Sequence, residues 1–165
     1  MELRPVSADD LGFLVAMTLL AAFPPGGIPE AAAEMPHVTR WVEEWGRPTD
    51  VGVVAWHDGD SPGEAWRVGA AWCRVQDNVL ARDAEGRALP ELAIAVAPDH
   101  QARGVGRLML DGIAQAASAA GHHSLSLQVN AHNPALRLYE RVGFEVVGRD
   151  GDRLTMVKSL GSNRG

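Results

Sequence analysis

The stretch that decides the fold is ELAIAVAPDHQARGVGRLML, residues 91–110. Its first part, up to Ala97, belongs to a near-continuous apolar run over Leu89–Ala97, which is typical of a central strand that is buried on both faces. Pro98 ends this run, because proline has no amide proton to give to a neighbouring strand. Gly104 and Gly106 then lead directly into a segment whose apolar residues repeat at helical spacing. The sequence therefore predicts a buried strand, a glycine-containing turn and a helix in immediate succession.

The glycine-containing turn predicts a site for phosphate groups. A strand that runs into a helix in this way leaves several backbone N–H groups unpaired at the helix N-terminus, where the helix dipole also favours negative charge. Without a Cβ atom, Gly104 and Gly106 allow a tight backbone and the close approach of phosphate oxygens. Arg103 adds a cation that can make charge-assisted hydrogen bonds. A turn with no ligand is the simpler alternative for a lone Gly-x-Gly pattern.

Two familiar nucleotide motifs fit this turn poorly. A dinucleotide fingerprint needs a third small residue at Met109 and normally occupies the first strand-helix unit of a chain. A Walker A loop needs Gly-Lys-Ser/Thr, and Gly106 is followed by Arg107 and Leu108. The turn therefore points away from both classes.

Composition bounds the class of protein. A chain of 165 residues with 46% hydrophobic content is expected to form one domain over residues 1–160, with a flexible tail at 161–165. The net charge of -6 argues against nucleic acid or anionic membrane as a partner and favours cationic acceptors. Cys73 is the only cysteine, which excludes an intramolecular disulfide and fits a cytoplasmic location. The apolar stretch Leu11–Phe23 is too short to span a bilayer, so we expect an amphipathic helix there.

The remaining elements follow from capping signals, apolar periodicity and turn residues. In chain order we expect a strand at Leu3–Val6, a helix capped by Ser7, a helix beginning at Pro36 with an apolar repeat up to Trp45, a hairpin of Val51–Trp56 and Ala65–Val75, a helix from Val105, a strand at Leu125–Val129, a helix opening at Asn133-Pro134, and closing strands at Phe144–Gly148 and Leu154–Lys158.

The run from Glu91 to Phe144 resembles the acetyl-CoA-binding half of GNAT acetyltransferases. Its Gln101-x-x-Gly104-x-Gly106 is similar to the superfamily pattern Arg/Gln-x-x-Gly-x-Gly/Ala, and the blocks NPA at 133–135 and LYERVGF at 138–144 are similar to its second common motif. The resemblance implies an α/β (α+β) fold, with a mixed, mostly antiparallel sheet splayed at a central parallel pair and flanked by helices. It also implies a transferase that moves an acetyl group from acetyl-CoA, its cosubstrate, to a primary amine by direct attack in a ternary complex, without a metal.

The same resemblance suggests the catalytic residues. Tyr139 aligns with the family tyrosine that points at the CoA sulfur, and its phenol is a donor at neutral pH, which suits a general acid. A purely packing role in the core is the alternative. Glu91 stands near the position of the general base in many members, and strand register decides whether it faces the acceptor cleft or solvent. His132 is an alternative base with a suitable ordinary pKa, and a water chain is another.

The residues implied to hold CoA lie on the strand, the turn and the following motif. The backbone of the strand is expected to pair with the pantetheine arm, and the Val96 amide to polarise the thioester carbonyl. Asn133 is expected to hold the arm, to cap the helix that follows, or to do both. The complete expected set is Ile94, Ala95, Val96, Gln101, Ala102, Arg103, Gly104, Val105, Gly106, Asn133 and Tyr139.

The acceptor is not identified by any motif. A small amine, a peptide or protein N-terminus and a lysine all fit, and the protein is expected to be a monomer or homodimer. In the superfamily the first helices and their loop set specificity, which here corresponds to Phe23–Trp45. Two other functions stay open at this point: a CoA-binding regulatory or sensor module without turnover, and a nucleotide-binding module without acyl chemistry.

Overall fold

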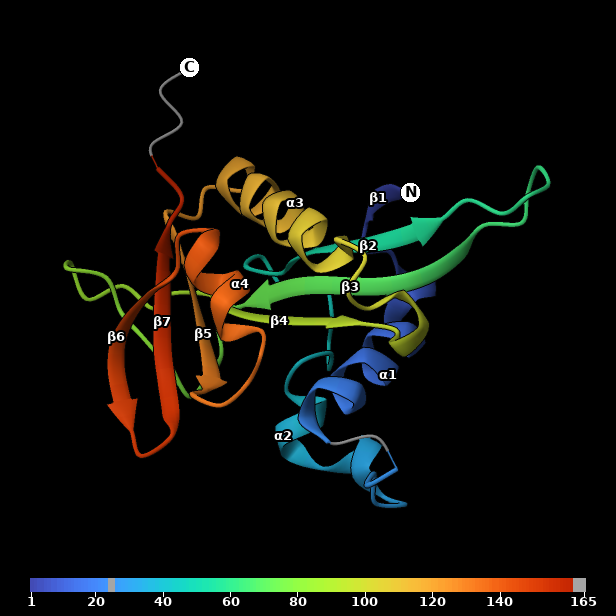
Figure 1. Cartoon of the computed structure of the whole chain (residues 1–165). Helices are drawn as coiled ribbons and strands as arrows, with labels where there is room; N and C mark the ends of the chain where they lie inside the picture. The colour runs from blue at the N-terminus through green and yellow to red at the C-terminus, as the bar shows by residue number, and fades with distance from the viewer. Residues whose placement is uncertain (24–25, 162–165) are drawn as a thin grey trace.

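The computed structural model describes residues 1–23 and 26–161 of the chain. It contains a single mixed sheet of seven strands in the order β1-β2-β3-β4-β5-β7-β6, with helices on both faces (Figure 1). The predicted tail at 161–165 lies, apart from Gly161, outside the described residues. The strands are β1 (Glu2–Pro5), β2 (Val51–His57), β3 (Trp66–Arg74), β4 (Glu91–Val96), β5 (Ser124–Asn130), β6 (Glu145–Asp150) and β7 (Arg153–Ser159), and the α-helices are α1 (Leu11–Ala22), α2 (Pro36–Thr39), α3 (Val105–Ala119) and α4 (Leu136–Arg141).

The centre of the sheet is its only parallel pair, β4 and β5, among the described residues. The two strands pair at a single position, Glu91 with Ser126, and the Ser126 amide also donates to the Pro90 carbonyl at 2.9 Å. Beyond this point they separate towards their carboxyl ends. The predicted mixed, mostly antiparallel sheet that splays at a central parallel pair is thus confirmed.

Two apolar cores cover the two faces of the sheet. On one face, α3 packs Met109 and Ile113 against the sheet. On the other face, α1 and the segment around α2 pack around Leu14 and Trp72. Because side chains alternate along β4, the strand serves both cores.

The N-terminal region agrees with the capping signals but not with the full length expected after Pro36. Ser7 donates its amide to Asp10 Oδ2 at 2.8 Å, and a short 3₁₀ turn leads into α1. The helix α2 does begin at Pro36, yet it ends at Thr39, and the apolar repeat continues through turns. Arg74 explains this difference. Its guanidinium donates to the carbonyls of Arg40 and Glu43, which in a longer helix would accept hydrogen bonds from backbone amides of the next turn.

No helix in residues 1–23 and 26–161 combines the length and the apolar character that crossing a membrane requires.

Candidate active site

The splayed edge of β4 is the first part of the site. The Ala97 amide donates to the carbonyl of Val68 on β3 at 2.8 Å. Backbone N–H and C=O groups point to alternate sides of a strand from one residue to the next. Ile94 and Val96 therefore direct their N–H and C=O groups towards β5, where no partner strand reaches them, whereas Ala95 directs its own towards β3. Gln101 donates its Nε2 to the Val96 carbonyl at 3.1 Å, which leaves the Val96 amide on the open edge.

The N-terminus of α3 is the second part of the site. Gly104 is the N-cap and has a φ of 82°, and Ala102 before it has a φ of 60°, so the turn uses left-handed backbone twice. The Leu108 amide donates to the Gly104 carbonyl at 3.1 Å. The amides from Gly104 to Arg107 precede this first helical bond and are free to bind an anion.

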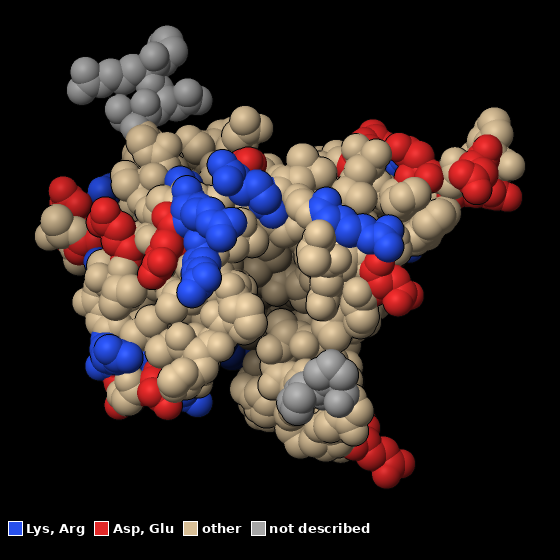
Figure 2. Space-filling model, viewed as in Figure 1, with Lys and Arg blue, Asp and Glu red and all other residues tan. Residues whose placement is uncertain are grey.

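Arginines occur on the two segments that meet at this helix end, the turn before α3 and the helix α4. The exposed side chains of Arg103, Arg137 and Arg141 make no ion pair with any described residue. A Cβ atom on Gly106 would lie 3.3 Å from Leu138 Cδ2, so α3 and α4 approach closely here. Figure 2 shows this face hollowed between α4 and the segment that joins β4 to α3, with Lys and Arg side chains on both sides of the hollow. The arrangement suits a ligand that carries several phosphates.

Tyr139 lies on α4, half-buried, with its ring edge-on to Phe144 at a centroid distance of 5.9 Å. Burial raises the pKa of Tyr139 to about 12. Its hydroxyl takes part in none of the side-chain hydrogen bonds among the described residues. The phenol therefore stays protonated and has its proton available for a ligand.

Glu91 occupies the point where β4 and β5 part. Its side chain is only 9% exposed, and Oε2 lies 3.4 Å from Arg40 Nη2. Burial raises the pKa of Glu91 and outweighs the opposing effect of the Arg40 charge. The register of β4 thus turns Glu91 inward, into a cavity, and away from bulk solvent.

The cavity beside Glu91 has a volume of about 800 Å³. Its wall combines α2 and the turn after it, the loop after β3, and single residues of β4, β5 and β7. The lining residues are Pro36, His37, Thr39, Arg40, Glu43, Arg47, Gln76, Asp77, Asn78, Val79, Leu80, Glu91, Gln128 and Arg153. These segments are far apart in the sequence, and most of the lining side chains are polar, so the cavity suits a polar molecule that can hydrogen-bond to them.

His132 and Asn133 have other neighbours. The imidazole of His132 is 80% exposed and lies 3.6 Å from Asp152 Oδ1, so it is a solvated side chain outside the cavity. Asn133 Oδ1 accepts the Ala135 amide at 2.9 Å. This local turn delays the helix, and α4 begins at Leu136 instead of at the expected Asn133-Pro134.

The family comparison agrees with this geometry. The model of the acetyltransferase (GNAT) family matches residues 16–144. The chain belongs to this family. The resemblance noted in the sequence is therefore confirmed, and it extends over most of the chain.

Individual relatives are more distant from this GNAT chain. Mycothiol acetyltransferase of Clavibacter sepedonicus is 35% identical over 91 residues, and the match covers 47% of this chain and 30% of that protein. The match thus spans less than a third of the relative's length.

Among solved structures, yncA of Salmonella typhimurium, determined with its cofactor acetyl-CoA, has a TM-score of 0.70 at 19% identity and covers 99% of this chain and 96% of its own. Ribosomal-protein-alanine N-acetyltransferase of Brucella melitensis has a TM-score of 0.67 at 24% identity, and the match covers 96% of this chain and 99% of that one. At such identities these likenesses establish the GNAT fold.

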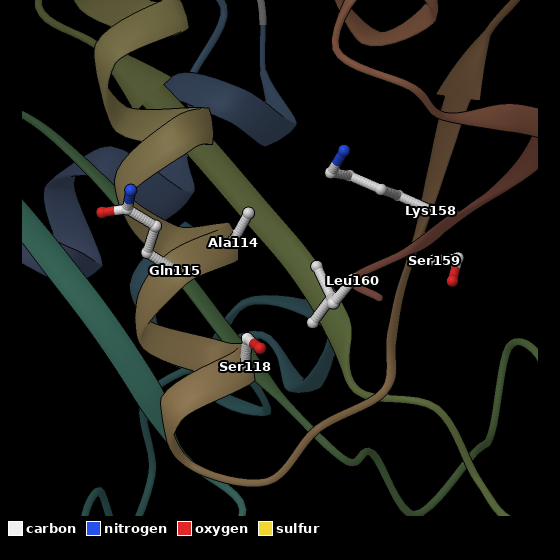
Figure 3. A pocket seen from close by; sticks show the side chains of 6 residues that line it. All are labelled: Ala114, Gln115, Ser118, Lys158, Ser159 and Leu160. Atoms are coloured by element: carbon white, nitrogen blue, oxygen red, sulfur yellow. The ribbon is translucent and has the colours of Figure 1, made fainter. Parts of the chain in front are cut away.

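A second cavity, of about 380 Å³, lies between the C-terminal half of α3 and the end of β7 in this GNAT domain. Figure 3 shows Ala114, Gln115 and Ser118 on the helix side and Lys158, Ser159 and Leu160 on the other. None of the residues expected in the active site lines it. Lys158 Nζ donates to the Val142 carbonyl and so secures the end of α4, which is a structural role.

No group of three or more His, Cys, Asp or Glu side chains is placed to hold a metal ion within the described ranges.

Several residues of the site carry no motif in the sequence. Arg40, Gln76 and Arg153 line the cavity from three separate segments, and nothing in their local patterns indicates it. Arg137 and Arg141 had a weak signal, since their spacing of four places both on one face of a helix.

Proposed function

We propose that this GNAT-family protein transfers an acetyl group from acetyl-CoA to a primary amine by direct attack in a ternary complex. The observation that carries the proposal is the splayed β4 edge, which has free helix amides at one end and the buried Glu91 carboxylate beside a cavity at the other. The solved Salmonella typhimurium structure, which has a similar fold, contains acetyl-CoA as its cofactor, and this supports acetyl-CoA as the cosubstrate here. The single sheet runs from Glu2 to Ser159, which supports one catalytic domain over residues 1–160.

The α3 turn is proposed to hold the pyrophosphate. The amides of Gly104, Val105 and Gly106 would donate to its oxygens, and Arg103 would add charge. The free groups of Ile94 and Val96 would pair with the amides of the pantetheine arm as an added strand does. The Val96 amide lies about 16 Å along the strand from Glu91, too far for both groups to act on one reacting centre. The Ile94 amide on the same open edge is nearer to Glu91 and is therefore the group that can donate to the thioester carbonyl oxygen, where negative charge develops during attack.

Glu91 is proposed to act as the base. An alkylammonium has an ordinary pKa of ~10.4 and must lose a proton before its nitrogen can attack. Glu91 accepts this proton directly or through one water, and its raised pKa brings the carboxylate closer to the affinity that a base needs near neutral pH. His132 fits this role less well, because it is exposed and lies beside Asp152.

Tyr139 is proposed to act as the acid. As the new C–N bond forms, the C–S bond breaks and leaves a thiolate with an ordinary pKa of ~8.5. The Tyr139 hydroxyl gives its proton to this sulfur, the nitrogen releases its second proton to solvent as the amide forms, and solvent returns a proton to the Tyr139 phenolate. Its own pKa of about 12 keeps it protonated before the reaction, as the role requires.

The test is the rate of CoA thiol release from acetyl-CoA with a panel of primary amines. At least one amine should accelerate release, and Glu91→Gln and Tyr139→Phe should each slow it. If no amine accelerates release while CoA still raises the melting temperature, the protein is a CoA-binding module without turnover. Stabilisation by ATP or NAD but not by CoA would point to a nucleotide-binding module instead.

A further inference from the structure

We infer that the acceptor is a zwitterion: a small primary amine, of the amino acid class, that also carries a carboxylate bound in the cavity beside Glu91. This inference rests on the proposed function and adds the chemistry of the second substrate. It depends on three features of the cavity, namely its charge balance, one buried donor without a partner, and the position of Arg40.

The charges that line the cavity are balanced. Three arginines and three carboxylates contribute to its wall. The charge of Arg47 is already matched, because its guanidinium lies 3.9 Å from the Glu43 carboxylate and 3.1 Å from the Glu44 carboxylate. Glu44 itself does not line the cavity. Arg153 and Asp77 take part in no ion pair with the described residues. One free charge of each sign is complementary to a ligand that carries both an ammonium and a carboxylate.

Gln76 supplies the buried donor. The residue is 5% exposed, and its Nε2 has no hydrogen-bond partner. A buried polar group without a partner costs free energy, so such a group needs an explanation. Gln76 is part of the cavity wall, but its Nε2 is closed to water. A rotation of the side chain would bring this donor to an oxygen of a bound carboxylate, which would provide the missing acceptor.

Arg40 connects the two ends of such a ligand. Its guanidinium lies over the Trp41 ring at 4.5 Å and reaches Glu91 at 3.4 Å, a long contact for an ion pair. A substrate carboxylate would compete with Glu91 for this guanidinium. Once Arg40 turns to the substrate, Glu91 is freed to take the ammonium proton. Binding of the carboxylate would thereby prepare the base.

The same wall offers a polycation no net attraction. The net charge of the whole chain, -6, favours cationic acceptors at long range. Inside the cavity, however, the carboxylates are matched by an equal number of arginines, so the second and third ammonium groups of a polyamine would lie beside Arg40 or Arg153 as readily as beside a carboxylate. Like charges at short range are costly, so the balanced wall favours a zwitterion over a polycation.

The experiment compares matched acceptors at saturating acetyl-CoA. Leucine, methionine, phenylalanine and histidine are each measured against their carboxamide and their decarboxylated amine, with CoA thiol release as the readout. We expect kcat/KM for the best amino acid to exceed that of both analogues by about tenfold or more. Amidation lowers the pKa of the neighbouring amine and so increases its free-base fraction. A preference for the acid therefore cannot come from amine basicity.

Variants test whether the preference for the amino acid over its carboxamide arises from the residues of this cavity. Arg153→Gln and Gln76→Leu should each reduce the ratio of kcat/KM for amino acid over carboxamide. Arg149→Gln removes the same charge from β6, where Arg149 binds only the Gly151 carbonyl and does not line the cavity, so it should keep the wild-type ratio. Thermal unfolding checks that each variant is folded.

The possible results separate the two proposals. Carboxamides that equal or exceed the acids, or turnover of spermidine and a tetrapeptide without turnover of any amino acid, would overturn the zwitterion inference and leave acyl transfer standing. An equal loss of the ratio in Arg149→Gln would also overturn the assignment to this cavity. If no acid, amide, polyamine or peptide releases CoA, the proposed function itself fails.

Discussion

Arg74 donates to both carboxylate oxygens of Asp50, with Nε–Oδ1 and Nη2–Oδ2 distances of 3.0 and 2.7 Å, and neither side chain reaches solvent. The remaining nitrogen of the guanidinium binds the carbonyls of Arg40 and Glu43 at 3.0 and 2.9 Å. This buried pair therefore ties the turn after α2 to the end of β3. Because Arg40 and Glu43 line the cavity, the pair holds one wall of the proposed acceptor site in place.

Replacing Arg74 should therefore lower the free energy of unfolding strongly. In Arg74→Met, the Asp50 carboxylate is left buried without its partner, which typically costs about 3–5 kcal/mol. Urea unfolding should show this loss, and the double variant Arg74→Met with Asp50→Asn should recover part of it. Arg87→Met removes an exposed pair with Asp83 and should leave the midpoint unchanged. A similar midpoint for Arg74→Met and the wild type would contradict the anchoring role.

Glu91→Gln should separate activity from stability. Loss of the base should lower kcat/KM for the amine by roughly 10²–10⁴. Burial raises the pKa of Glu91 in the folded protein, so ionising it destabilises the fold as the pH rises through that pKa. The variant should then melt above the wild type at neutral pH, and the difference should vanish in acid. The wild-type rate should also rise along an acidic limb that Glu91→Gln lacks, and the same limb in both proteins would exclude Glu91 as its source.

Tyr139→Phe should reduce turnover but not binding. The phenyl ring keeps the edge-on contact with Phe144, so the melting temperature should stay close to that of the wild type. Loss of the acid should lower kcat by about 10², the low end of the usual range, because a thiolate is already a fair leaving group. With a pKa of about 12, this phenol should add no alkaline limb near neutral pH. Unchanged kcat would assign Tyr139 to packing alone.

Gly104→Ala tests the α3 turn. The φ of 82° at Gly104 is costly for a residue with a Cβ atom, by roughly 1–2 kcal/mol. We expect lower stability together with a higher KM for acetyl-CoA, measured by chemical unfolding and initial rates. Gly12→Ala is the matched control: Gly12 lies in α1 with no atom within 4 Å of an added Cβ, so alanine should stabilise by about 0.5–1 kcal/mol. A KM unaffected by Gly104→Ala would argue against a phosphate site at this turn.

Cys73 should be inert in the folded protein. It is fully buried, and burial together with the Asp50 charge raises its pKa to about 12. Almost no thiolate is then present at neutral pH, and thiolate is the reactive form. A chromogenic thiol reagent should label the native chain only as fast as it unfolds, and should label one thiol per chain in urea. Fast labelling of native protein would show that the thiol is accessible.

The parts of the site that the sequence predicted are contiguous in the chain. The turn from Gln101 to Gly106 and the block containing Tyr139 each depend on local backbone conformation, which a few adjacent residues determine. Local patterns are poorer guides where side chains compete for backbone groups. Arg74, distant in the sequence, shortens α2 by binding the Arg40 and Glu43 carbonyls. The competitor at α4 is local, since Asn133 Oδ1 accepts the Ala135 amide and delays the start of that helix.

By itself the sequence indicated the family, through the two blocks at 101–106 and 133–144 that resemble it. It also predicted the order of the elements and a glycine-containing turn before α3, because capping, periodicity and glycine positions are properties of the local chain. Only the tertiary structure decided that Glu91 faces inward, since the two faces of a strand differ by one residue of register. It also brought Arg40, Gln76 and Arg153 around the same cavity. Their meeting depends on how the sheet and its loops pack together, and no local pattern contains that information.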